Sequence, residues 1–534
     1  MALNPVTRVD ADVAVLGSGF AGSLTALALL RRGRRVALIE RGRHPRFAIG
    51  ESSTPLANLL VEEIADRYDL PRVRAFSKWG TWQRTRPDVA CGLKRGFTFF
   101  FHEPNERFRD GAERERQLMV AASPHDEIAD THWYRPEFDR ALAKEAQEAG
   151  ATYLDMTHVT GLHLEGESTI LDAERESHAI RIRTPFVIDA SGPRGFLHRE
   201  LKLGEAPTRW LPPTQGLYTH FADVERWDRL RTVSDRPPYP IDDAALHHLF
   251  PGGWIWVLRF NNGITSAGAA LTDRTAASLR AADGEEAWGR LMAGLPSVAE
   301  QFRSARAVVP FIHAPRLAFR SARVAGSSWA LLPSAAGVID PLLSTGFPLT
   351  LLGIIRLLDV LERTSPGDER NAALTRYEAT TLAELDLTEQ LVAALYATME
   401  EPQLFKRLSL LYFAAASYSE AARRLGRANL APGFLLREHP TFASELTGCS
   451  LLAAMTPQGA ARKSLEQRIE RAIEPFDIAG LLHPQRRSWY PVLAEDLLRS
   501  ASKLRATEDE IRRLLERTGM VTLTTPSAPP TVLP

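Results

Sequence analysis

Short apolar runs alternate with a helical pattern at the start of the chain. Residues 11–16 end in the apolar run VAVL, and residues 36–39 read VALI before the acidic Glu40. Between them, leucine and alanine recur at helical spacing over residues 23–32. An apolar run of this length is typical of a buried strand, and the leucine spacing is typical of a helix that packs on a sheet. The pattern therefore predicts a strand–helix–strand unit.

The rest of the chain changes from mixed to helical patterning. Residues 213–320 contain several β-rich stretches, and an Asn-Asn-Gly turn at residues 261–263 separates two of them as in a β-hairpin. From residue 349 to 518 the pattern is strongly helical, and the final residues have the composition of a disordered tail. We therefore expect an α/β (α+β) chain in which a β-rich region interrupts the Rossmann-like domain and a helical region follows. The predicted boundaries are 1–212 and 323–365 for the two parts of that domain, 213–322 for the insertion, 366–520 for the helical region and 521–534 for the tail.

A glycine-rich loop, GSGFAG, joins the first strand to the first helix. In a dinucleotide-binding unit, the positions of Gly17, Gly19 and Gly22 serve a tight turn, a close approach of the backbone to a pyrophosphate, and the packing of helix on strand. The helix start also offers unpaired N–H groups to the phosphates. Glu40 closes the second strand about 20 residues later, where a carboxylate can accept hydrogen bonds from a ribose 2′-hydroxyl. A unit of this shape that binds nothing remains the alternative.

Composition narrows the class of protein. The chain has 534 residues, 44% of them hydrophobic, and its 65 basic and 65 acidic residues balance, so a nucleic-acid surface is not expected. Two distant cysteines, Cys91 and Cys449, offer neither a disulfide framework nor a metal-binding spacing, so we expect no metal and a reducing compartment. The N-terminus has no signal-peptide pattern, and glycines and prolines interrupt the least charged stretch, residues 327–355. A cytoplasmic chain without a membrane span is expected.

Six short motifs follow one another along the chain: GSGFAG with Glu40, GESSTP, HWYRPEFD, VIDASG, GGWIWVLRF and GVIDPLLSTG. In this combination the chain resembles the flavin-dependent halogenases, within the class-A flavin monooxygenase fold, over residues 10–365. The resemblance implies FAD as the cofactor. Ordinary structural roles remain open for Arg135, as a surface salt bridge, and for Asp189, as a strand-end turn. The residues that the motifs assign to FAD are Gly17, Gly19, Phe20, Ala21, Gly22, Glu40, Arg41, Gly50, Glu51, Ser52, Arg135, Asp189, Ser334, Asp340 and Pro341.

The resemblance also assigns chemistry beyond FAD binding. In halogenases, reduced FAD and O₂ convert halide to hypohalous acid, and a lysine between flavin and substrate passes the electrophile on. Lys94 matches the family's K-x-G-x-x-F pattern, and Lys78 is the second candidate. A lysine desolvated among aromatic rings has a lowered pKa, whereas the alternative for both is a solvent-exposed charge. Thr345 and Gly346 match the halide-binding backbone, unless their N–H groups only hold the flavin's pyrimidine carbonyl.

Two tryptophans match half of another halogenase motif, W-x-W-x-I-P. Trp254 and Trp256 are expected on the same face of a strand, and the resemblance implies that they wall a tunnel between flavin and substrate. Core packing is the alternative. Leu258 and Arg259 stand where Ile and Pro are expected, so that side of the strand is predicted to be exposed or paired.

Two further departures bear on function. Ser334, within Pro333-Ser334-Ala335, replaces the Asp of the family's Gly-Asp-Ala, so FAD is expected to be held loosely, as in an enzyme that receives reduced FAD from a separate reductase. Leu343 occupies the position of a Glu that free-tryptophan halogenases carry, which places the chain nearer the phenol and pyrrole type. The resemblance thus implies halogenation of an electron-rich small molecule, free or bound to a carrier protein, with halide and a flavin reductase as partners. A hydroxylase or epoxidase of the same fold and a flavin-binding relative without catalysis remain alternatives.

Overall fold

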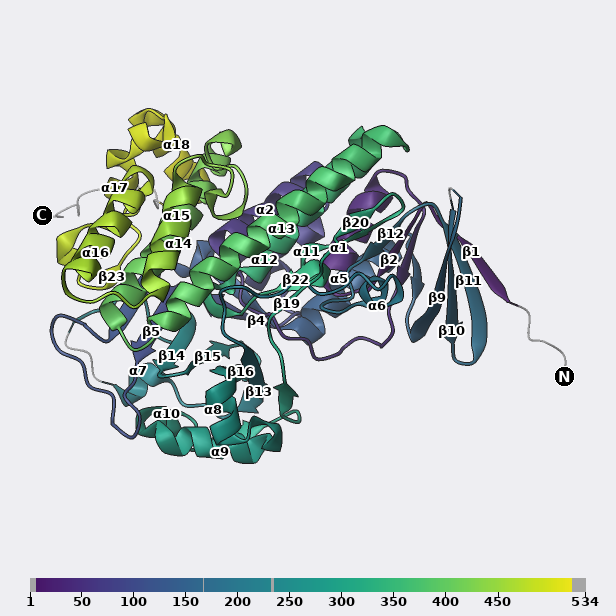
Figure 1. Ribbon diagram of the computed structural model, residues 1–534. Helices are drawn as coiled ribbons and strands as arrows, with labels where there is room; N and C mark the ends of the chain where they lie inside the picture. Colours follow the sequence, from purple (N-terminus) through teal and green to yellow (C-terminus); the bar gives the residue numbers. More distant parts are fainter. Residues whose placement is uncertain (1–5, 167, 232–234, 521–534) are drawn as a thin grey trace, which may run out of the picture.

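The computed structural model describes residues 6–166, 168–231 and 235–520, and the predicted tail at 521–534 lies outside them. Two large sheets lie beside one another, and the C-terminal helices pack across both (Figure 1). The predicted fold class, a Rossmann-like domain with a β-rich layer and a helical C-terminal region, is confirmed.

A six-stranded sheet carries the predicted strand–helix–strand unit. β2 (Val13–Leu16) and β3 (Val36–Ile39) pair in parallel, and α1 (Phe20–Arg31) joins them. All residues of both strands are buried, as expected for parallel strands that are covered on both faces. In spatial order the sheet runs β20 (Ala325–Gly326), β21 (Trp329–Leu331), β12 (Val187–Asp189), β2, β3 and β8 (Thr152–Leu154).

A nine-stranded sheet forms the β-rich layer. Its central hairpin pairs β15 (Gly253–Arg259) with β16 (Thr265–Thr272) around the predicted Asn-Asn-Gly turn. The sheet also includes strands from before residue 213 and after residue 366. The domain boundaries given above stay a prediction. In spatial order it runs β17 (Arg306–Ala307), β13 (Thr214–Ala222), β16, β15, β14 (Ala245–Phe250), β5 (Gly96–Phe101), β6 (Gln117–Ala121) and β23 (Trp489–Tyr490), with β18 (Ile312–Ala314) paired to β13.

Three smaller sheets of the described chain accompany these two layers. A two-stranded sheet pairs β4 (Cys91–Lys94) with β7 (Asp130–Trp133). It lies so close to the end of β15 that a Cβ at Gly92 would overlap the carbonyl oxygen of Arg259. The others are the four-stranded sheet of β1 (Thr7–Asp10), β11 (His178–Thr184), β10 (Ser168–Arg175) and β9 (Thr157–Glu165), and the pair β19 (Phe319–Arg320) and β22 (Gly337–Val338).

Helices cover both sheets, and the longest, α13 (Asp368–Ala397), runs diagonally across the molecule beside α12 (Gly346–Arg363) (Figure 1). The others before it are α2 (Pro55–Arg67), α3 (Pro71–Arg74), α4 (Trp79–Thr85), α5 (Arg135–Glu148), α6 (Phe196–Glu200), α7 (Trp227–Leu230), α8 (Asp273–Leu279), α9 (Glu285–Gly294), α10 (Pro296–Gln301) and α11 (Pro333–Ala336). After it come α14 (Pro402–Arg424), α15 (Phe442–Ala454), α16 (Gly459–Ile473), α17 (Ala494–Arg499) and α18 (Glu508–Thr518).

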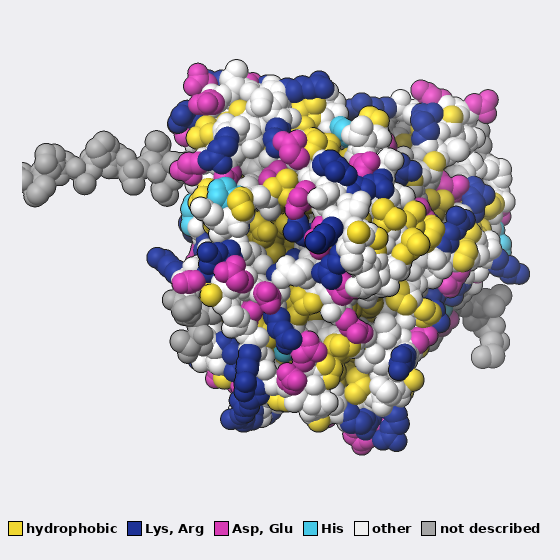
Figure 2. All heavy atoms as spheres, turned by 60° about the vertical axis from the view of Figure 1, so that its left-hand side comes forward, with side chains coloured by type: hydrophobic (Ala, Val, Ile, Leu, Met, Phe, Trp, Pro, Cys, Tyr) yellow, Lys and Arg dark blue, Asp and Glu magenta, His cyan; other side chains and the backbone are white. Residues whose placement is uncertain are grey.

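Among the described residues one helical stretch, Leu342–Arg363, is long and apolar enough to cross a membrane, with a mean hydropathy of 1.5 over its apolar part. However, 67% of that 18-residue apolar part is buried, and α12 packs against α1, α2 and α13 as a core helix does. On the face that carries the C-terminal helices, basic and acidic side chains are interspersed, with small apolar patches between them (Figure 2).

Candidate active site

The glycine-rich loop has the backbone geometry that a dinucleotide needs. Gly17 has φ +95°, and a Cβ there would lie 2.8 Å from the carbonyl oxygen of Ala190 in the VIDASG turn. A Cβ at Gly22 would overlap the carbonyl oxygen of Gly17. At Gly19, by contrast, the nearest atoms to an added Cβ are 3.5 Å away, on the side chains of Arg135 and Asp139. Two glycines are therefore required by the turn and the packing, while the third leaves its backbone open to a ligand.

Glu40 is buried at the end of β3 and is bonded to the loop. Its carboxylate accepts hydrogen bonds from the backbone N–H groups of Ser18 and Gly42, both at 3.0 Å, and pairs with Arg46 at 3.1 Å. Burial raises the pKa of Glu40, but Arg46 and the two N–H groups outweigh it, so the pKa is lowered and the group is ionised. The ribose contact of Glu40 stays a prediction, and Arg41 is exposed beyond it.

Arg135 joins the loop to two other motifs. It forms a two-pronged bond with Asp139, both contacts at 2.7 Å, and donates to the carbonyl oxygens of Ile49 and Gly50. A guanidinium has five N–H donors, so this leaves one on the nitrogen that faces Gly19. Asp139 was not among the predicted site residues, although the four-residue spacing from Arg135 on a predicted helix is a usable signal.

An aromatic cluster brings three motifs together at the start of α1. The rings of Phe20, Trp133 and Phe347 lie with centroids 4.2 to 5.4 Å apart. These residues come from GSGFAG, HWYRPEFD and the segment after DPLLSTG. The structure thus assembles in one place motifs that lie more than three hundred residues apart in sequence.

The DPLLSTG loop is strained and fixed by its aspartate. Leu343 and Ser344 have φ +64° and +55°, a left-handed conformation that is uncommon for residues other than glycine and costs conformational energy. Asp340 accepts hydrogen bonds from Leu342 N–H at 3.0 Å and from the hydroxyl of Tyr396 at 2.9 Å, and burial raises its pKa to about 7. Pro341 follows at the turn into the loop.

Thr345 and Gly346 lie where this loop becomes α12. Thr345 is buried, whereas Gly346 is exposed and an added Cβ would meet no atom within 4 Å. Helix α12 is 18 residues long and begins at Gly346, so its first N–H groups and its positive dipole end lie at an open surface. Halide binding there stays a prediction.

Both tryptophans of β15 are buried on one face, with ring centroids 5.7 Å apart, as predicted. The indole N–H of Trp254 donates to the Tyr396 hydroxyl at 3.1 Å, and that of Trp256 to Ser266 at 3.3 Å. Trp254, Tyr396 and Asp340 therefore form a hydrogen-bonded chain from β15 to the DPLLSTG loop. Tyr396 was not predicted, because no local pattern on its helix marks it.

Lys94, at the end of β4, is fully buried. Its ammonium donates to the Ser52 hydroxyl at 2.8 Å and to the carbonyl oxygen of Ser53, and it lies 3.8 Å from the ring centre of Phe97. Burial lowers the pKa of Lys94 to about 7, against the attraction of Asp130. Lys78 is half-buried near Glu62, at 3.9 Å, so Lys94 and not Lys78 contacts the GESSTP motif.

Two acidic residues of the motifs are engaged within the protein. Glu51 is fully buried and bonded to His220 at 2.9 Å, a partner 169 residues away that sequence reasoning missed. Asp189 accepts hydrogen bonds from Ser191 N–H and Leu197 N–H, both at 2.8 Å, and so shapes the turn that touches Gly17. This matches the strand-end alternative for Asp189, and contact with FAD stays a prediction.

Comparison with known proteins identifies the family. A family model described as FAD dependent oxidoreductase matches residues 12–323. Monodechloroaminopyrrolnitrin halogenase PrnC of Pseudomonas fluorescens is 30% identical over 411 residues, which cover 75% of this chain and 70% of that protein. The chain belongs to the flavin-dependent halogenases.

Other members of the family agree. Tetracycline 7-halogenase of Kitasatospora aureofaciens is 30% identical over 351 residues, 64% of this chain and 61% of that protein. The crystal structure of halogenase PltM in complex with phloroglucinol and FAD superposes with a TM-score of 0.79 at 23% identity, over 89% of this chain and 99% of that one. The fold is therefore shared with PltM, and the predictions of an enzyme of this family with FAD as cofactor are confirmed.

A cavity of about 140 Å³ lies between the β-rich layer and the C-terminal helices of this halogenase. Phe97, the ring under Lys94, forms part of its wall beside Thr54 and Pro55 of the GESSTP motif. Most of the lining is apolar, and Glu420 and Arg424, an ion pair at 2.7 Å, are its charged side chains. The wall also includes Val120, Tyr412, Phe413, Ile478, Leu481, Tyr490, Leu493, Leu497, Leu514 and Leu515.

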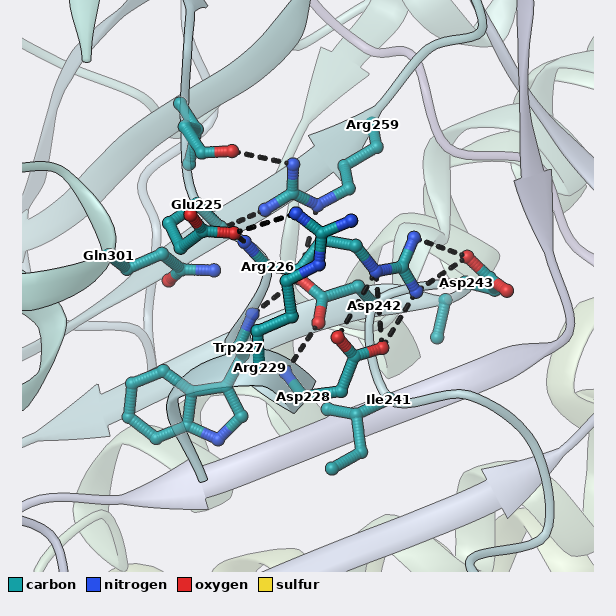
Figure 3. A network of polar contacts seen from close by, with 12 residues as sticks. Glu225, Arg226, Trp227, Asp228, Arg229, Ile241, Asp242, Asp243, Arg259 and Gln301 are labelled. Atoms are coloured by element: carbon teal, nitrogen blue, oxygen red, sulfur yellow. Dashed lines mark hydrogen bonds and ion pairs between the residues drawn. The ribbon is translucent and has the colours of Figure 1, made fainter. Parts of the chain in front are cut away.

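Two of the departures from the halogenase motifs, at Arg259 and Ser334, have different structural contexts. Arg259 is half-buried and ties the end of β15 to Asp242 at 3.0 Å and to the backbone carbonyls of Val224 and Glu225 (Figure 3). Asp242 also accepts from the N–H groups of Trp227 and Asp228. The predicted pairing on that side of the strand is thus found. Ser334 is half-buried, and within the described chain its hydroxyl has no hydrogen-bond partner.

Proposed function

We propose that this halogenase uses reduced FAD, O₂ and halide to halogenate an electron-rich aromatic substrate, and that Lys94 passes the electrophilic halogen on. The observation that carries the proposal is the place of Lys94, whose ammonium is buried, held by the GESSTP loop, and set over a ring that also walls the cavity. A cation fixed there can hold hypohalous acid by a hydrogen bond at one point beside the substrate. That fixes where the halogen is delivered.

Reduced FAD, when bound, would supply two of the four electrons that reduce O₂, and the halide would supply the other two as it becomes hypohalous acid and water is released. The chain's own residues do the rest. Thr345 and Gly346 offer the halide N–H groups and the positive end of α12. Lys94 keeps its ammonium fully buried, where a charge-assisted hydrogen bond is stronger than in water. The ring of Phe97 packs against the Lys94 ammonium, at 3.8 Å from the ring centre, and forms part of the cavity wall.

The cavity and the relatives support a substrate class. Relatives are named as halogenases of monodechloroaminopyrrolnitrin, of tetracycline and of 1H-pyrrole-2-carbonyl on a peptidyl carrier protein. The cavity is apolar apart from Glu420 and Arg424, which suits an uncharged aromatic ring with one polar substituent. The substrate is accordingly a phenol- or pyrrole-type molecule, free or carried by a protein. A separate flavin reductase and a cytoplasmic location belong to this proposal.

The decisive experiment compares wild type, Lys94→Ala and Lys78→Ala. Each protein receives reduced FAD from an added flavin reductase, bromide, air and a panel of phenols and pyrroles, and products are read by mass spectrometry. We expect brominated product from wild type and Lys78→Ala, and a loss of about 100-fold or more in Lys94→Ala. FAD binding, followed by flavin absorbance, should be equal in all three proteins.

Three outcomes would contradict the proposal, each differently. Full bromination by Lys94→Ala would remove Lys94 from the reaction. Oxygenated product that forms equally with and without bromide would favour the hydroxylase alternative. Wild-type protein that binds FAD but yields neither product with any member of the panel would favour the non-catalytic relative.

A further inference from the structure

Asp130 stands directly opposite Lys94 on the neighbouring strand. In the antiparallel pair of β4 and β7, Lys94 is the register partner of Asp130, and both side chains are buried, at 0% and 6% exposure. Residues directly opposite each other project from the same face of the two strands, with Cβ atoms about 5 Å apart. The register therefore holds a carboxylate beside the ammonium proposed to act in halogen transfer.

The carboxylate of Asp130 is only half engaged. One oxygen accepts a hydrogen bond from the side-chain amide of Asn58 at 2.8 Å, and the other is buried with no hydrogen-bond partner in the described chain. Lys94 gives two of its three N–H donors to Ser52 and Ser53. The described side chains of Lys94 and Asp130 form no ion pair within 4.0 Å, so they act on each other through space. In an apolar interior that interaction is weakly screened.

The other groups around this pair add little net charge. Burial keeps the pKa values of His132 and His247 well below the ordinary histidine range and raises the pKa of Tyr412. All three side chains are therefore neutral near pH 7. Glu420 and Arg424 form an ion pair with each other, so their charges offset. The titratable and charged groups that face Lys94 and Asp130 are His132 on β7, His247 on β14, and Tyr412, Glu420 and Arg424 on α14.

We propose that Asp130 is a positioning residue for halogen transfer, whose carboxylate, opposite Lys94 in the β4–β7 register, keeps Lys94 in the ammonium form. The inference rests on the proposed function of Lys94. Asp130 does not line the cavity and acts only through Lys94. Burial favours the neutral amine and the neutral acid: it is the main cause that lowers the pKa of Lys94 and raises that of Asp130, each to about 7 with the attraction between them included. Their mutual attraction opposes both shifts, so loss of either charge exposes the other to the full effect of burial.

The test measures the pKa of Lys94 without turnover. The chain has only seven lysines, so lysine labelled with ¹³C at Cε gives few NMR signals, and the one missing from Lys94→Ala is assigned to Lys94. We expect Asp130→Asn to lower the pKa of Lys94 by about one unit or more. The limb of the pH–rate profile for bromination that reports Lys94 should move to lower pH by the same amount. Asp242→Asn, which changes a buried carboxylate in the network of Figure 3, should leave the pKa of Lys94 in place.

An unchanged pKa of Lys94 in folded, FAD-binding Asp130→Asn would overturn the inference. A pH–rate profile that stays in place although the pKa of Lys94 has shifted would also overturn it. If Asp130→Asn does not fold, the test uses Asp130→Glu, which keeps the negative charge. The pKa of Lys94 in this variant should stay within about half a unit of the wild-type value. A fall of about a full unit would overturn the inference. Because the NMR signal needs no reaction, failure of the proposed function is seen separately, as bromination by Lys94→Ala.

Discussion

The hydroxyl of Tyr396 connects two predicted parts of the active site, and its removal has a calculable cost. Tyr396→Phe deletes one oxygen atom with little change in shape. The hydroxyl donates to Asp340 at 2.9 Å and accepts from the indole N–H of Trp254 at 3.1 Å, and all three side chains are buried. The variant therefore leaves one carboxylate oxygen and one indole N–H without this partner.

The cost depends on the charge of Asp340. When Asp340 is ionised, the lost hydrogen bond to a charged group and the orphaned indole N–H together cost about 3–5 kcal/mol. For a chain of 534 residues, an unfolding entropy of about 2.1 cal/mol/K per residue converts this to a fall in Tm of roughly 3–4 °C. When Asp340 is protonated, the indole N–H is still orphaned but the other lost bond is a neutral one, and the cost falls to about 2–4 kcal/mol.

The pH dependence follows from the raised pKa of Asp340, about 7 in the folded protein. Between about pH 3.9, the ordinary pKa of an aspartate, and about pH 7, the folded state binds more protons than the unfolded state. The stability that protonation of Asp340 contributes is therefore full at low pH and is lost as the pH rises through 7. The Tyr396 hydroxyl favours the ionised form, so its removal raises the pKa of Asp340 further. The destabilisation of Tyr396→Phe relative to wild type should therefore grow as pH rises through 7.

The assay is thermal unfolding followed by tryptophan fluorescence at about pH 5.5 and about pH 8.5. Tyr377→Phe is the matched control, because this buried tyrosine on the same helix donates at 2.8 Å to a neutral group, the carbonyl oxygen of Leu331. Its loss should cost about 1–2 kcal/mol at both pH values. An equal loss of stability by Tyr396→Phe at the two pH values would refute the reasoning.

Two further substitutions test the cofactor loop and the Arg259 network. Gly17→Ala should abolish FAD binding in an absorbance titration, because the position needs φ +95° and an added Cβ would lie 2.8 Å from Ala190. Gly346→Ala, with open space around the added Cβ, should bind FAD normally. Equal binding by both variants would show that the loop does not hold FAD. Arg259→Met leaves the buried carboxylate of Asp242 without its cation, so we expect a loss of about 3 kcal/mol in denaturant unfolding with FAD affinity unchanged. A stability within about 0.5 kcal/mol of wild type would contradict that account.

Sequence reasoning succeeded where the physical requirement is local. The glycine loop is recognisable because Gly17 and Gly22 are required by backbone contacts within one strand–helix unit. The shared face of Trp254 and Trp256 follows from the alternation of any strand. Lys94 was predictable as a candidate because of its family pattern, although its burial depends on Phe97 and on chain far away.

The partners of these residues were not predictable, because they depend on tertiary register. Asp130 meets Lys94 only through the pairing of β4 with β7, and nothing in either segment encodes that alignment. Tyr396 reaches Asp340 across 56 residues through the position of a long helix. His220 pairs with Glu51 across 169 residues, on a strand of the other sheet. In each case a buried polar group needed a partner, but its identity was set by how whole elements pack.

Helix α13 has a consequence for anyone who wants to exchange parts between enzymes of this family. Its 30 residues extend about 45 Å, and along that length Glu378 binds Ala325 N–H in the six-stranded sheet, Glu389 binds Arg320, and Tyr396 binds Trp254 in the nine-stranded sheet. A chimaera joined at residue 365 would give the recipient a foreign helix at all three contacts. A junction after Ala397, in the turn at residues 398–401, would transplant the cavity-lining helices and leave the recipient's two sheets clamped by their own helix.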